Sequence, residues 1–499
     1  MRVKKIICVL LLLILALSAA LAASCGPGGG AADDPNTTTQ EPGGEETTAE
    51  PARVMPDLPD MDFEGRVFLA LGRDDSKYQQ FVNFEIEAES INGELVNDAV
   101  YNRNRRLEDR YNIKIEQDLR EDPPGILQRL VKADDDVYNL AFIVQNNIGS
   151  MASSGMFYDL HSLKYLDFEK PWWSLEVNKS ISVGNRLYFT TSDFNMMDKN
   201  RTYMLAFNKD LAEAYGLGNF YDLVYSSRWT VDKMAELCKA VSSDVDGDGI
   251  MTDADRWGLG MDSYNAFYTF WSACDNYMFT KDAGDYPLLS VNNEHTVSSI
   301  DRLMKLTNDE SISFYCNSFQ GKVSYDFWYV SSTLFYEGRL LFTATFTHGL
   351  RNYAQSDVNY GVLPFPKYDE NQANYISTAD NYHSALFAVP MTAQDPDFSG
   401  FMLEALSAAS KYEVMPYYYE VSTKTKYTYD EESPKMLDII FGGLRYDLGA
   451  TYNWGGINDL FRVTLPQTGQ NSFVSKYESM EAKILKAMEK TINTFNELP

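Results

Sequence analysis

The sequence has few residues of the kinds that build reactive or metal-bound centres. It contains 5 Cys and 4 His in 499 residues, and the histidines have no metal-ligand spacing. The HExxH, GxSxG and phosphate-binding-loop patterns are absent. Carboxylates are abundant, so a glycosidase that uses an acid pair stays open, although no pair stands out. These absences favour a binding protein over an enzyme.

Positive charge is scarce as well. The chain has 43 Lys and Arg against 71 Asp and Glu, a formal net charge of −28. Such an acidic chain argues against binding to nucleic acid and against docking flat on anionic lipid. It favours solubility and a neutral or cationic ligand.

A long apolar run, 6–23, follows the basic residues Arg2, Lys4 and Lys5 and predicts a secretory signal. The sequence LAASC at 21–25 resembles the lipoprotein cleavage box of bacteria, although the usual leucine stands one position early. We therefore predict a lipoprotein signal peptide over 1–24 and lipidation of Cys25. Acyl chains such as palmitate would anchor the protein to the extracellular face of the cell membrane. A retained membrane-spanning helix is the competing interpretation.

Residues 25–60 lack aromatic side chains and are rich in Gly, Pro, Thr and Glu. A segment of this composition cannot bury enough apolar surface to fold, which predicts a disordered acidic tether. Beyond it stand three widely spaced cysteines, Cys238, Cys274 and Cys316. We expect no disulfide framework and at least one unpaired cysteine, buried as a small hydrophobic side chain.

What the chain does contain is a regular alternation of apolar strands and amphipathic helices. Strands are predicted over 65–71, 113–119 and 138–144, with helices over 92–112 and 124–133. This order indicates an α/β fold with a parallel or mixed sheet. Ligands of such sheets collect at the carboxyl ends of strands, which here are followed by the polar residues Arg73, Asp74, Gln145, Asn146 and Asn147.

The segment 187–211 reads as two apolar strands separated by a polar insert that holds Asp193 and Asn195. We interpret it as the first connection between two lobes, with the insert facing the gap between them. An ordinary hairpin is the alternative. Segments 338–345 and 382–390 are predicted to form the second and third connections.

Several segments, taken in order, resemble the extracellular solute-binding proteins of ABC importers. These are YMLAFNKDL, RWTVDKMAELCKAV, GRLLFTATF, VNYGVLPFPKYD and HSALFAVP with a helix after it. The match is best with the carbohydrate-binding, maltose-binding-protein-like lipoproteins (family 1), and it spans about 65–495. The acidic tether and the large region 415–456 depart from the simplest members.

The resemblance implies a type II periplasmic-binding-protein-like fold, in which two α/β lobes with three interlobe crossings close on a sugar. It places 61–190 and 341–385 in the N-terminal lobe, and 191–340 and 386–499 in the C-terminal lobe. It also implies a monomer that binds a carbohydrate ligand and delivers it to ABC transporter permease subunits. A surface glycoside hydrolase, a peptide-binding member of the same fold and an adhesion lipoprotein are the alternatives.

The acidic segment 244–255, DVDGDGIMTDAD, matches an EF-hand-type loop. Asp244, Asp246 and Asp248 stand at its first, third and fifth positions, Ile250 offers a backbone carbonyl, and Asp255 stands at the twelfth. Calcium needs many oxygen ligands at this flexible spacing, so we predict a structural calcium site. A solvated acidic turn is the alternative.

Aromatic side chains are the expected platforms for a sugar, because pyranose rings present apolar C–H faces. Trp271 and Trp454 stand in polar surroundings and are predicted to stack on the ligand, with Trp328 and Trp173 next. For each of them burial in a core is the alternative. The polar ligand contacts that we predict are Arg73, Asp74, Gln145, Asn146, Asn147, Asp193 and Asn195.

Overall fold

The computed structural model describes residues 53–419 and 428–498. The predicted signal peptide, Cys25 and the tether up to residue 52 lie outside the described residues. From Arg53 onward the chain forms one compact unit. Among the described residues, no helix is both long enough and apolar enough to cross a membrane.

The end of the predicted tether contacts the folded body. The Val54 amide donates to the Tyr412 hydroxyl at 3.1 Å, and Lys170 pairs with Asp57 at 2.8 Å. Leu58 packs against the core. The prediction that the tether extends to residue 60 is therefore wrong for its last eight residues, because these contacts hold them on the body.

The first sheet has four strands in the order β12-β3-β1-β2. They are β1 (Arg66–Arg73), β2 (Ile113–Arg120), β3 (Leu140–Val144) and β12 (Ala385–Ala388). β1 pairs in parallel with β2 and β3, while β12 adds an antiparallel edge to β3. The predicted alternation of strands and helices is confirmed here by α2 (Leu95–Tyr111) and α3 (Pro123–Ala133).

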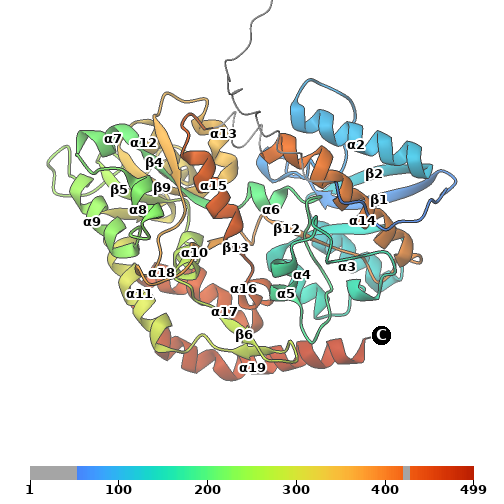
Figure 1. Cartoon of the computed structure of the whole chain (residues 1–499). Coiled ribbons are helices and arrows are strands. Elements are labelled where there is room, and N and C mark those ends of the chain that lie inside the picture. Colours follow the sequence, from blue (N-terminus) through green and yellow to red (C-terminus); the bar gives the residue numbers. More distant parts are fainter. Residues whose placement is uncertain (1–52, 420–427, 499) are drawn as a thin grey trace, which may run out of the picture. The chain divides into compact units, whose positions relative to one another are not determined.

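Helix α14 (Pro396–Glu413) covers this first sheet together with α2 (Figure 1). Its N-terminus is fixed by Asp395, whose side chain accepts the Phe398 amide. The Phe398 ring packs on Phe63 and Phe68. α14 thus belongs to the N-terminal lobe. The assignment of 386–499 as a whole to the C-terminal lobe is wrong at this helix, because the aromatic face of α14 packs on the first sheet.

The second sheet has five strands in the order β10-β4-β9-β5-β8. They are β4 (Tyr203–Asn208), β5 (Trp257–Met261), β8 (Ser313–Tyr315), β9 (Leu340–Phe346) and β10 (Tyr360–Leu363). β9 pairs with β4 on one side and with β5 on the other. It therefore cannot be the predicted second connection, and the assignment of 341–385 to the N-terminal lobe is wrong for β9 and β10.

Further helices and short strands surround the two sheets. In the first lobe and the first crossing they are η1 (Gln79–Phe81), α4 (Gln145–Ala152), η2 (Leu160–Ser162), α5 (Leu175–Ile181) and α6 (Met197–Asn200). Around the second sheet they are α7 (Lys209–Ala214), α8 (Phe220–Tyr225), α9 (Val231–Val241), α10 (Asn265–Ala273), β6 (Phe279–Lys281), β7 (Pro287–Leu289), α11 (Glu294–Thr307), η3 (Cys316–Phe319), η4 (Phe327–Tyr329), α12 (Val330–Tyr336), η5 (Thr347–Gly349) and α13 (Leu350–Tyr353). The C-terminal part adds β11 (Ser377–Thr378), α15 (Ser433–Gly442), β13 (Leu444–Arg445), α16 (Leu448–Tyr452), η7 (Trp454–Gly456), α17 (Ile457–Asp459), η8 (Leu460–Thr464), α18 (Leu465–Thr468) and α19 (Phe473–Glu497).

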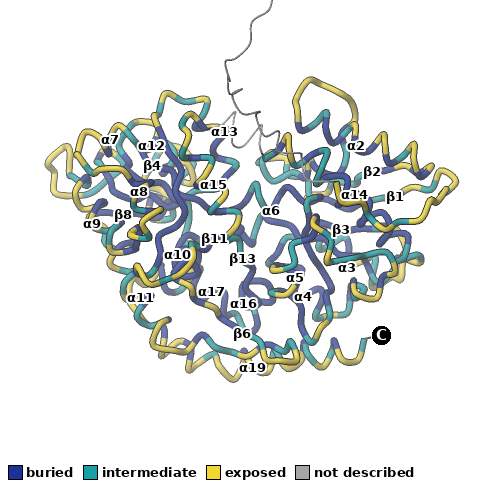
Figure 2. The backbone as a smooth tube through the Cα atoms, in the orientation of Figure 1, coloured by how far each residue is buried: buried dark blue, intermediate teal, exposed yellow. Residues whose placement is uncertain are grey.

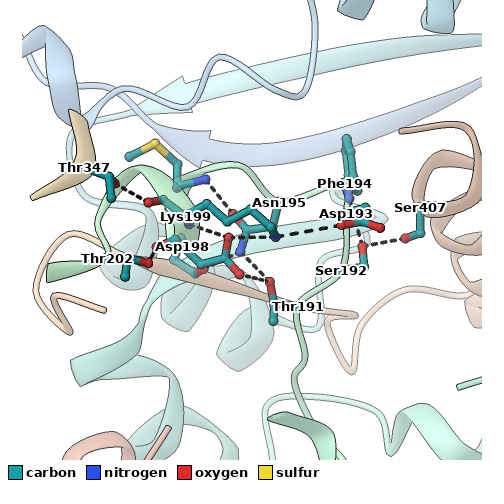
Figure 3. A network of polar contacts seen from close by, with 12 residues as sticks. Thr191, Ser192, Asp193, Phe194, Asn195, Asp198, Lys199, Thr202, Thr347 and Ser407 are labelled. Atoms are coloured by element: carbon teal, nitrogen blue, oxygen red, sulfur yellow. Dashed lines mark hydrogen bonds and ion pairs between the residues drawn. The ribbon is translucent and has the colours of Figure 1, made fainter. Parts of the chain in front are cut away.

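The chain passes from the first sheet to the second through 191–202, where polar groups satisfy one another (Figure 3). The Asp198 carboxylate accepts the Thr191 hydroxyl at 2.8 Å, and the Asn195 amide donates to the Thr191 hydroxyl at 3.0 Å. The Thr202 hydroxyl donates to the backbone of Asp198 at 2.9 Å. The predicted first connection is present. Its polar insert was predicted to face the gap between the lobes, but these side chains bond to one another and hold the crossing together.

The return crossing is 376–385. The predicted third connection, 382–390, overlaps only its end, because β12 lies within the first sheet. Helix α15 belongs to the second lobe, because the Val362 amide of β10 donates to the Ser433 hydroxyl at 3.1 Å. Helix α19 runs along both lobes (Figure 1). Asn471, just before it, donates to Asp301 of the second lobe, and Phe495 near its end packs on Tyr188 of the first.

Burial follows this arrangement (Figure 2). Most strands of the two sheets are buried, except the edge strand β2, in which only Ile113 and Ile115 are buried, and exposed residues gather on outer helices such as α2 and α19. Cys238, Cys274 and Cys316 are buried and free, as expected from their spacing.

Candidate functional site

A cavity of about 580 Å³ lies where loops of the two lobes meet, and we call it the main cavity. Its size falls in the usual range for small-molecule sites. η1 and its neighbour Tyr78 line it from the first lobe, and η4 and α12 line it from the second. The two crossings 191–202 and 376–385 contribute Arg201, Asp380 and His383.

Aromatic rings form much of the wall of the main cavity. Trp328 and Tyr329 are 43% and 49% exposed, although both have large apolar rings. Asp326 fixes the start of their short helix by accepting the Trp328 amide. The other aromatic lining residues are Tyr78, Phe81, Tyr336, Phe346, Tyr353 and Tyr382. Exposed flat rings beside a cavity are suited to stacking on the apolar faces of a ligand.

Arg201 connects both lobes at the floor of the main cavity. Its guanidinium donates to the backbone oxygen of Gln80 at 2.6 Å and lies 3.2 Å from His348 Nδ1. It also lies over the Phe81 ring, 4.2 Å from the ring centre. Burial lowers the pKa of Arg201 to about 10, so it stays charged at neutral pH. Burial and this cation hold the pKa of His348 well below its ordinary value, which leaves a neutral imidazole.

Two carboxyl groups in the main cavity differ in protonation. Burial raises the pKa of Asp262 to about 8, and the charge of Asp380 adds to this shift. Burial acts in the same direction on Asp380, but the nearby His383 and Arg201 lower the pKa of Asp380 to about 2. One oxygen of Asp262, Oδ1, has no hydrogen-bond partner. The site therefore offers a protonated carboxyl group and a charged carboxylate.

A second cavity of about 200 Å³ adjoins the main one and shares Phe81, Tyr382 and His383 with it. It lies at the carboxyl ends of β1 and β3, where Arg73, Asn146 and Asn147 line it. In parallel sheets, this edge is the usual position of ligands.

The structure brings four of the predicted ligand contacts to the two cavities. Arg73, Asn146 and Asn147 line the second cavity, and Trp328 lines the main cavity. Asp74 lines neither of them.

Three other predicted polar contacts lie elsewhere. Gln145 is buried, and its amide donates to the Thr451 hydroxyl at 2.9 Å. Asn195 is buried in the first crossing and donates to the backbone of Ala385 at 2.7 Å. Asp193 lines a different hollow, where it pairs with Lys411 at 3.3 Å. The predictions for Gln145, Asn195 and Asp193 are corrected, because their polar groups bind the protein itself.

The tryptophans predicted to stack on a ligand are mostly core residues. Trp271 is fully buried in α10, and its ring lies 4.0 Å from that of Phe461. Trp454 is buried against Tyr452, and its indole N–H donates to Thr491 at 2.8 Å. Trp173 is buried and donates to Glu404. Stacking on a ligand is therefore wrong for these three tryptophans, because neighbouring side chains cover their rings.

Replacing Trp271 with alanine is expected to destabilise the fold by about 3–5 kcal/mol, because it opens a large cavity in the core. Chemical denaturation measures this loss. The full burial of Trp271 makes this a test of its assignment to the core. A stability equal to that of the unmodified protein would contradict that assignment.

Arg201, Asp262, Asp380, Tyr382 and Tyr78 were missed by the sequence-based prediction. A usable signal existed for only part of the main cavity. Aromatic residues stand beside polar ones in DFWY at 326–329 and in NYHS at 381–384, outside any helical or strand period. Arg201 and Asp262 carry no such signal, since each is a single charged residue next to a strand.

The acidic loop brings three of its predicted ligands together. Asp244, Asp246 and Asp255 each place a carboxylate oxygen within 4.8 Å of the others. The Asp244 carboxylate accepts the amides of Gly247 and Gly249, both at 2.7 Å, which wraps the loop around it. These carboxylates are hard oxygen donors of the kind that calcium prefers. Asp248 and Ile250 lie in the same exposed loop.

No protein-family model and no curated protein matches this sequence. Solved structures do match it. A cyclo/maltodextrin-binding protein in complex with maltotetraose has a TM-score of 0.53 at 14% identity, over 86% of this chain and 97% of that chain. An ABC substrate-binding protein from Listeria monocytogenes, in complex with cycloalternan, has a TM-score of 0.50 at 11% identity, over 87% and 98%.

The GacH receptor of Streptomyces glaucescens, whose structures include a complex with acarbose, has a TM-score of 0.50 at 12% identity, over 87% and 98%. Identities this low establish the fold alone. The chain has the two-lobe α/β fold of the maltose-binding-protein-like substrate-binding proteins, and the fold that the sequence predicts is confirmed.

Proposed function

We propose that this protein is the substrate-binding subunit of an ABC importer and captures a sugar or oligosaccharide in the main cavity. The observation that carries the proposal is the lining of that cavity. Exposed rings such as Trp328 and Tyr329 stand beside Asp262 and Asp380, and the lining residues come from both lobes. Rings stack on the C–H faces of a sugar, while carboxyl groups bind its hydroxyls. The solved structures of the same fold hold maltotetraose, cycloalternan and acarbose.

Capture needs no covalent chemistry. A ligand that contacts both lobes stabilises the arrangement in which the lobes are close, through its higher affinity for that state. One contact already joins the lobes beside the main cavity, since Lys77 of the first lobe lies 3.8 Å from Asp326 of the second. The first crossing and the return crossing are the segments about which the lobes would move.

The proposal includes a lipid anchor at Cys25 and a monomer on the extracellular face of the membrane, which delivers its sugar to the permease subunits. The support is the apolar leader and the LAASC sequence. Residues 53–58 contact the first lobe, so the anchor would hold the protein through that lobe.

Thermal-shift measurements on the full-length chain in detergent, against a panel of mono- and oligosaccharides, test the function. A saccharide that binds the folded state raises the melting temperature. We expect a rise with at least one saccharide and no cleavage products in the same samples. Cleaved sugar would identify a glycoside hydrolase, for which Asp262 and Asp380 would be the acid pair. A response to peptides and to no sugar would overturn the carbohydrate ligand.

We also propose that Asp244, Asp246, Asp248, Ile250 and Asp255 bind calcium as a structural clip. The close approach of three of these carboxylates supports the proposal. Bound metal would offset the repulsion between them and stabilise the turn before β5.

Removal of calcium with EGTA is expected to lower the melting temperature, because an ion at about 100 times its Kd stabilises a fold by about 2.7 kcal/mol. Added calcium should restore it. The double variant Asp244→Asn, Asp246→Asn serves as the matched control and should not respond to EGTA. An identical melting curve of the unmodified protein with EGTA and with calcium would contradict the site.

A further inference from the structure

The charged side chains of the main cavity do not share the acidic character of the whole chain. Its described lining contains two arginines, Arg201 and Arg462, and two aspartates, Asp262 and Asp380, but no lysine or glutamate. Burial raises the pKa of Asp262 to about 8, so this carboxyl group is protonated at neutral pH. Two guanidinium groups therefore stand against one charged carboxylate. In a chain with a formal net charge of −28, the main cavity has a surplus of positive charge.

Arg462 of η8 brings a guanidinium group to the wall of the main cavity. Its Nε donates to Asn265 and its Nη1 to the Tyr382 hydroxyl, and the group lies over the Tyr382 ring, 3.6 Å from the ring centre. Asp459, which does not line the cavity, lies 3.6 Å from Nη1. The remaining nitrogen, Nη2, makes no hydrogen bond with any described residue and is not closed off from solvent. The contacts thus fix the guanidinium group and leave Nη2 open to a ligand.

Arg201, at the floor of the main cavity, is a buried cation. It is 1% exposed, and no carboxylate among the described residues forms an ion pair with its guanidinium group. Its side chain contacts the backbone oxygen of Gln80 and the neutral His348. Asp380 attracts it only from farther away, and the carboxylate of Asp380 contacts His383. A buried charge without a counter-ion destabilises a fold, so an anion in the cavity would offset part of this effect.

Arg103, the other fully buried arginine among the described residues, is held differently. Its nitrogens donate to Asn104, to Ser410 and to two backbone oxygens, so each of them has an acceptor. Arg201 Nε has no hydrogen-bond partner. The protein therefore satisfies a buried guanidinium group where nothing binds, and leaves one incompletely satisfied beside the main cavity.

We infer that the saccharide captured in the main cavity is acidic, and that a carboxylate such as that of a uronic acid unit pairs with Nη2 of Arg462 while Arg201 attracts it from the floor. This inference rests on the proposed function and names the class of saccharide. The planar guanidinium group matches a carboxylate in shape, and hydrogen bonds between charged groups are among the stronger ones in proteins. Trp328 and Tyr329 remain available for the C–H faces of the sugar rings.

Isothermal titration calorimetry on the full-length chain in detergent tests the inference with oligomers of galacturonate, mannuronate and glucuronate. Each acid is compared with its own methyl ester, which keeps every hydroxyl group and removes the charge. We expect at least one acid to bind. Its ester should bind about ten- to hundredfold more weakly, as expected for the loss of a hydrogen bond between charged groups.

The ratio of the two affinities, acid over ester, is the quantity to follow in variants, because a general distortion of the site cancels from it. Arg462→Gln removes the charge and should bring the ratio close to one, whereas Arg462→Lys keeps the charge and should recover part of it. Arg228→Gln is the matched control, since Arg228 is an exposed arginine of the second lobe that lines neither cavity. Arg228→Gln should keep the full ratio. Trp328→Ala should weaken acid and ester alike.

Several results would overturn the inference and leave sugar binding intact. One is equal affinity of the unmodified protein for an acid and its ester. Another is binding of a neutral or sulfated saccharide when no uronate binds. A full ratio in Arg462→Gln, with a normal melting curve, would also overturn it. If no saccharide of any charge binds the unmodified protein, the proposed function fails and the inference fails with it.

Discussion

Replacing Trp328 with alanine is expected to weaken saccharide binding by about one to two orders of magnitude, with the melting temperature of the free protein unchanged. The ring is 43% exposed in the main cavity, so its removal leaves no hole in the core. Tryptophans that become covered on binding commonly cost more than about 2 kcal/mol when they are truncated. Calorimetric titration with the saccharide found by thermal shift gives the affinity.

Tyr225→Ala is the control for this variant. Tyr225 is an aromatic residue of the same lobe, is 52% exposed and lines neither cavity. We expect it to bind saccharide normally. Equal affinities for Trp328→Ala and the unmodified protein would mean that the rim of the main cavity does not contact the ligand.

Replacing Glu404 with glutamine is expected to stabilise the protein at pH 8 by about 3 kcal/mol, the free energy that corresponds to its pKa shift. Glu404 is 1% exposed on α14, and burial raises its pKa from 4.5 to about 7. Its Oε2 accepts the Trp173 indole N–H at 2.9 Å, while Oε1 has no partner. Glutamine keeps an acceptor for Trp173 and carries no charge.

The direction of this effect depends on pH. Between pH 4.5 and about 7 the folded protein keeps a proton on Glu404 that the unfolded chain releases, so stability falls as pH rises through this window. Above about pH 7 the buried carboxylate is charged, and the full destabilisation by this charge is present. The free energy of unfolding, measured by denaturation at pH 4 and at pH 8, should therefore fall less between these two pH values for Glu404→Gln than for the unmodified protein. Glu176→Gln, at an exposed position of α5, should behave like the unmodified protein. An equal fall of the unfolding free energy in the unmodified protein and in both variants would refute the buried charge of Glu404.

The architecture was predictable because it follows from local periodicity. Apolar runs such as 138–144 and the helical stripes of α2 and α19 predict elements that the structure confirms. The lobe boundaries were harder to predict from the sequence. β9 has the same apolar pattern whether it crosses between lobes or lies inside a sheet, and α14 packs on strands that are hundreds of residues away in the sequence.

The site could be predicted at the strand ends and at Trp328. Arg73, Asn146 and Asn147 follow β1 and β3, so the general rule for parallel sheets placed them correctly at a cavity. Trp271 was misassigned because its polar neighbours indicated a loop, whereas the segment forms the helix α10, which is buried on all sides. Asn195 is polar, but its hydrogen bonds go to the crossing itself. A single sequence does not show which tertiary partner such a side chain contacts.

Hydrogen–deuterium exchange of the full-length chain, with and without the saccharide found by thermal shift, tests most directly whether a sugar binds between the lobes. The account predicts slower exchange in 78–83 of the first lobe, in 326–329 of the second and in the return crossing 380–383, all in the same experiment. Saccharide binding with protection confined to one lobe, or with none of these segments protected, would contradict it.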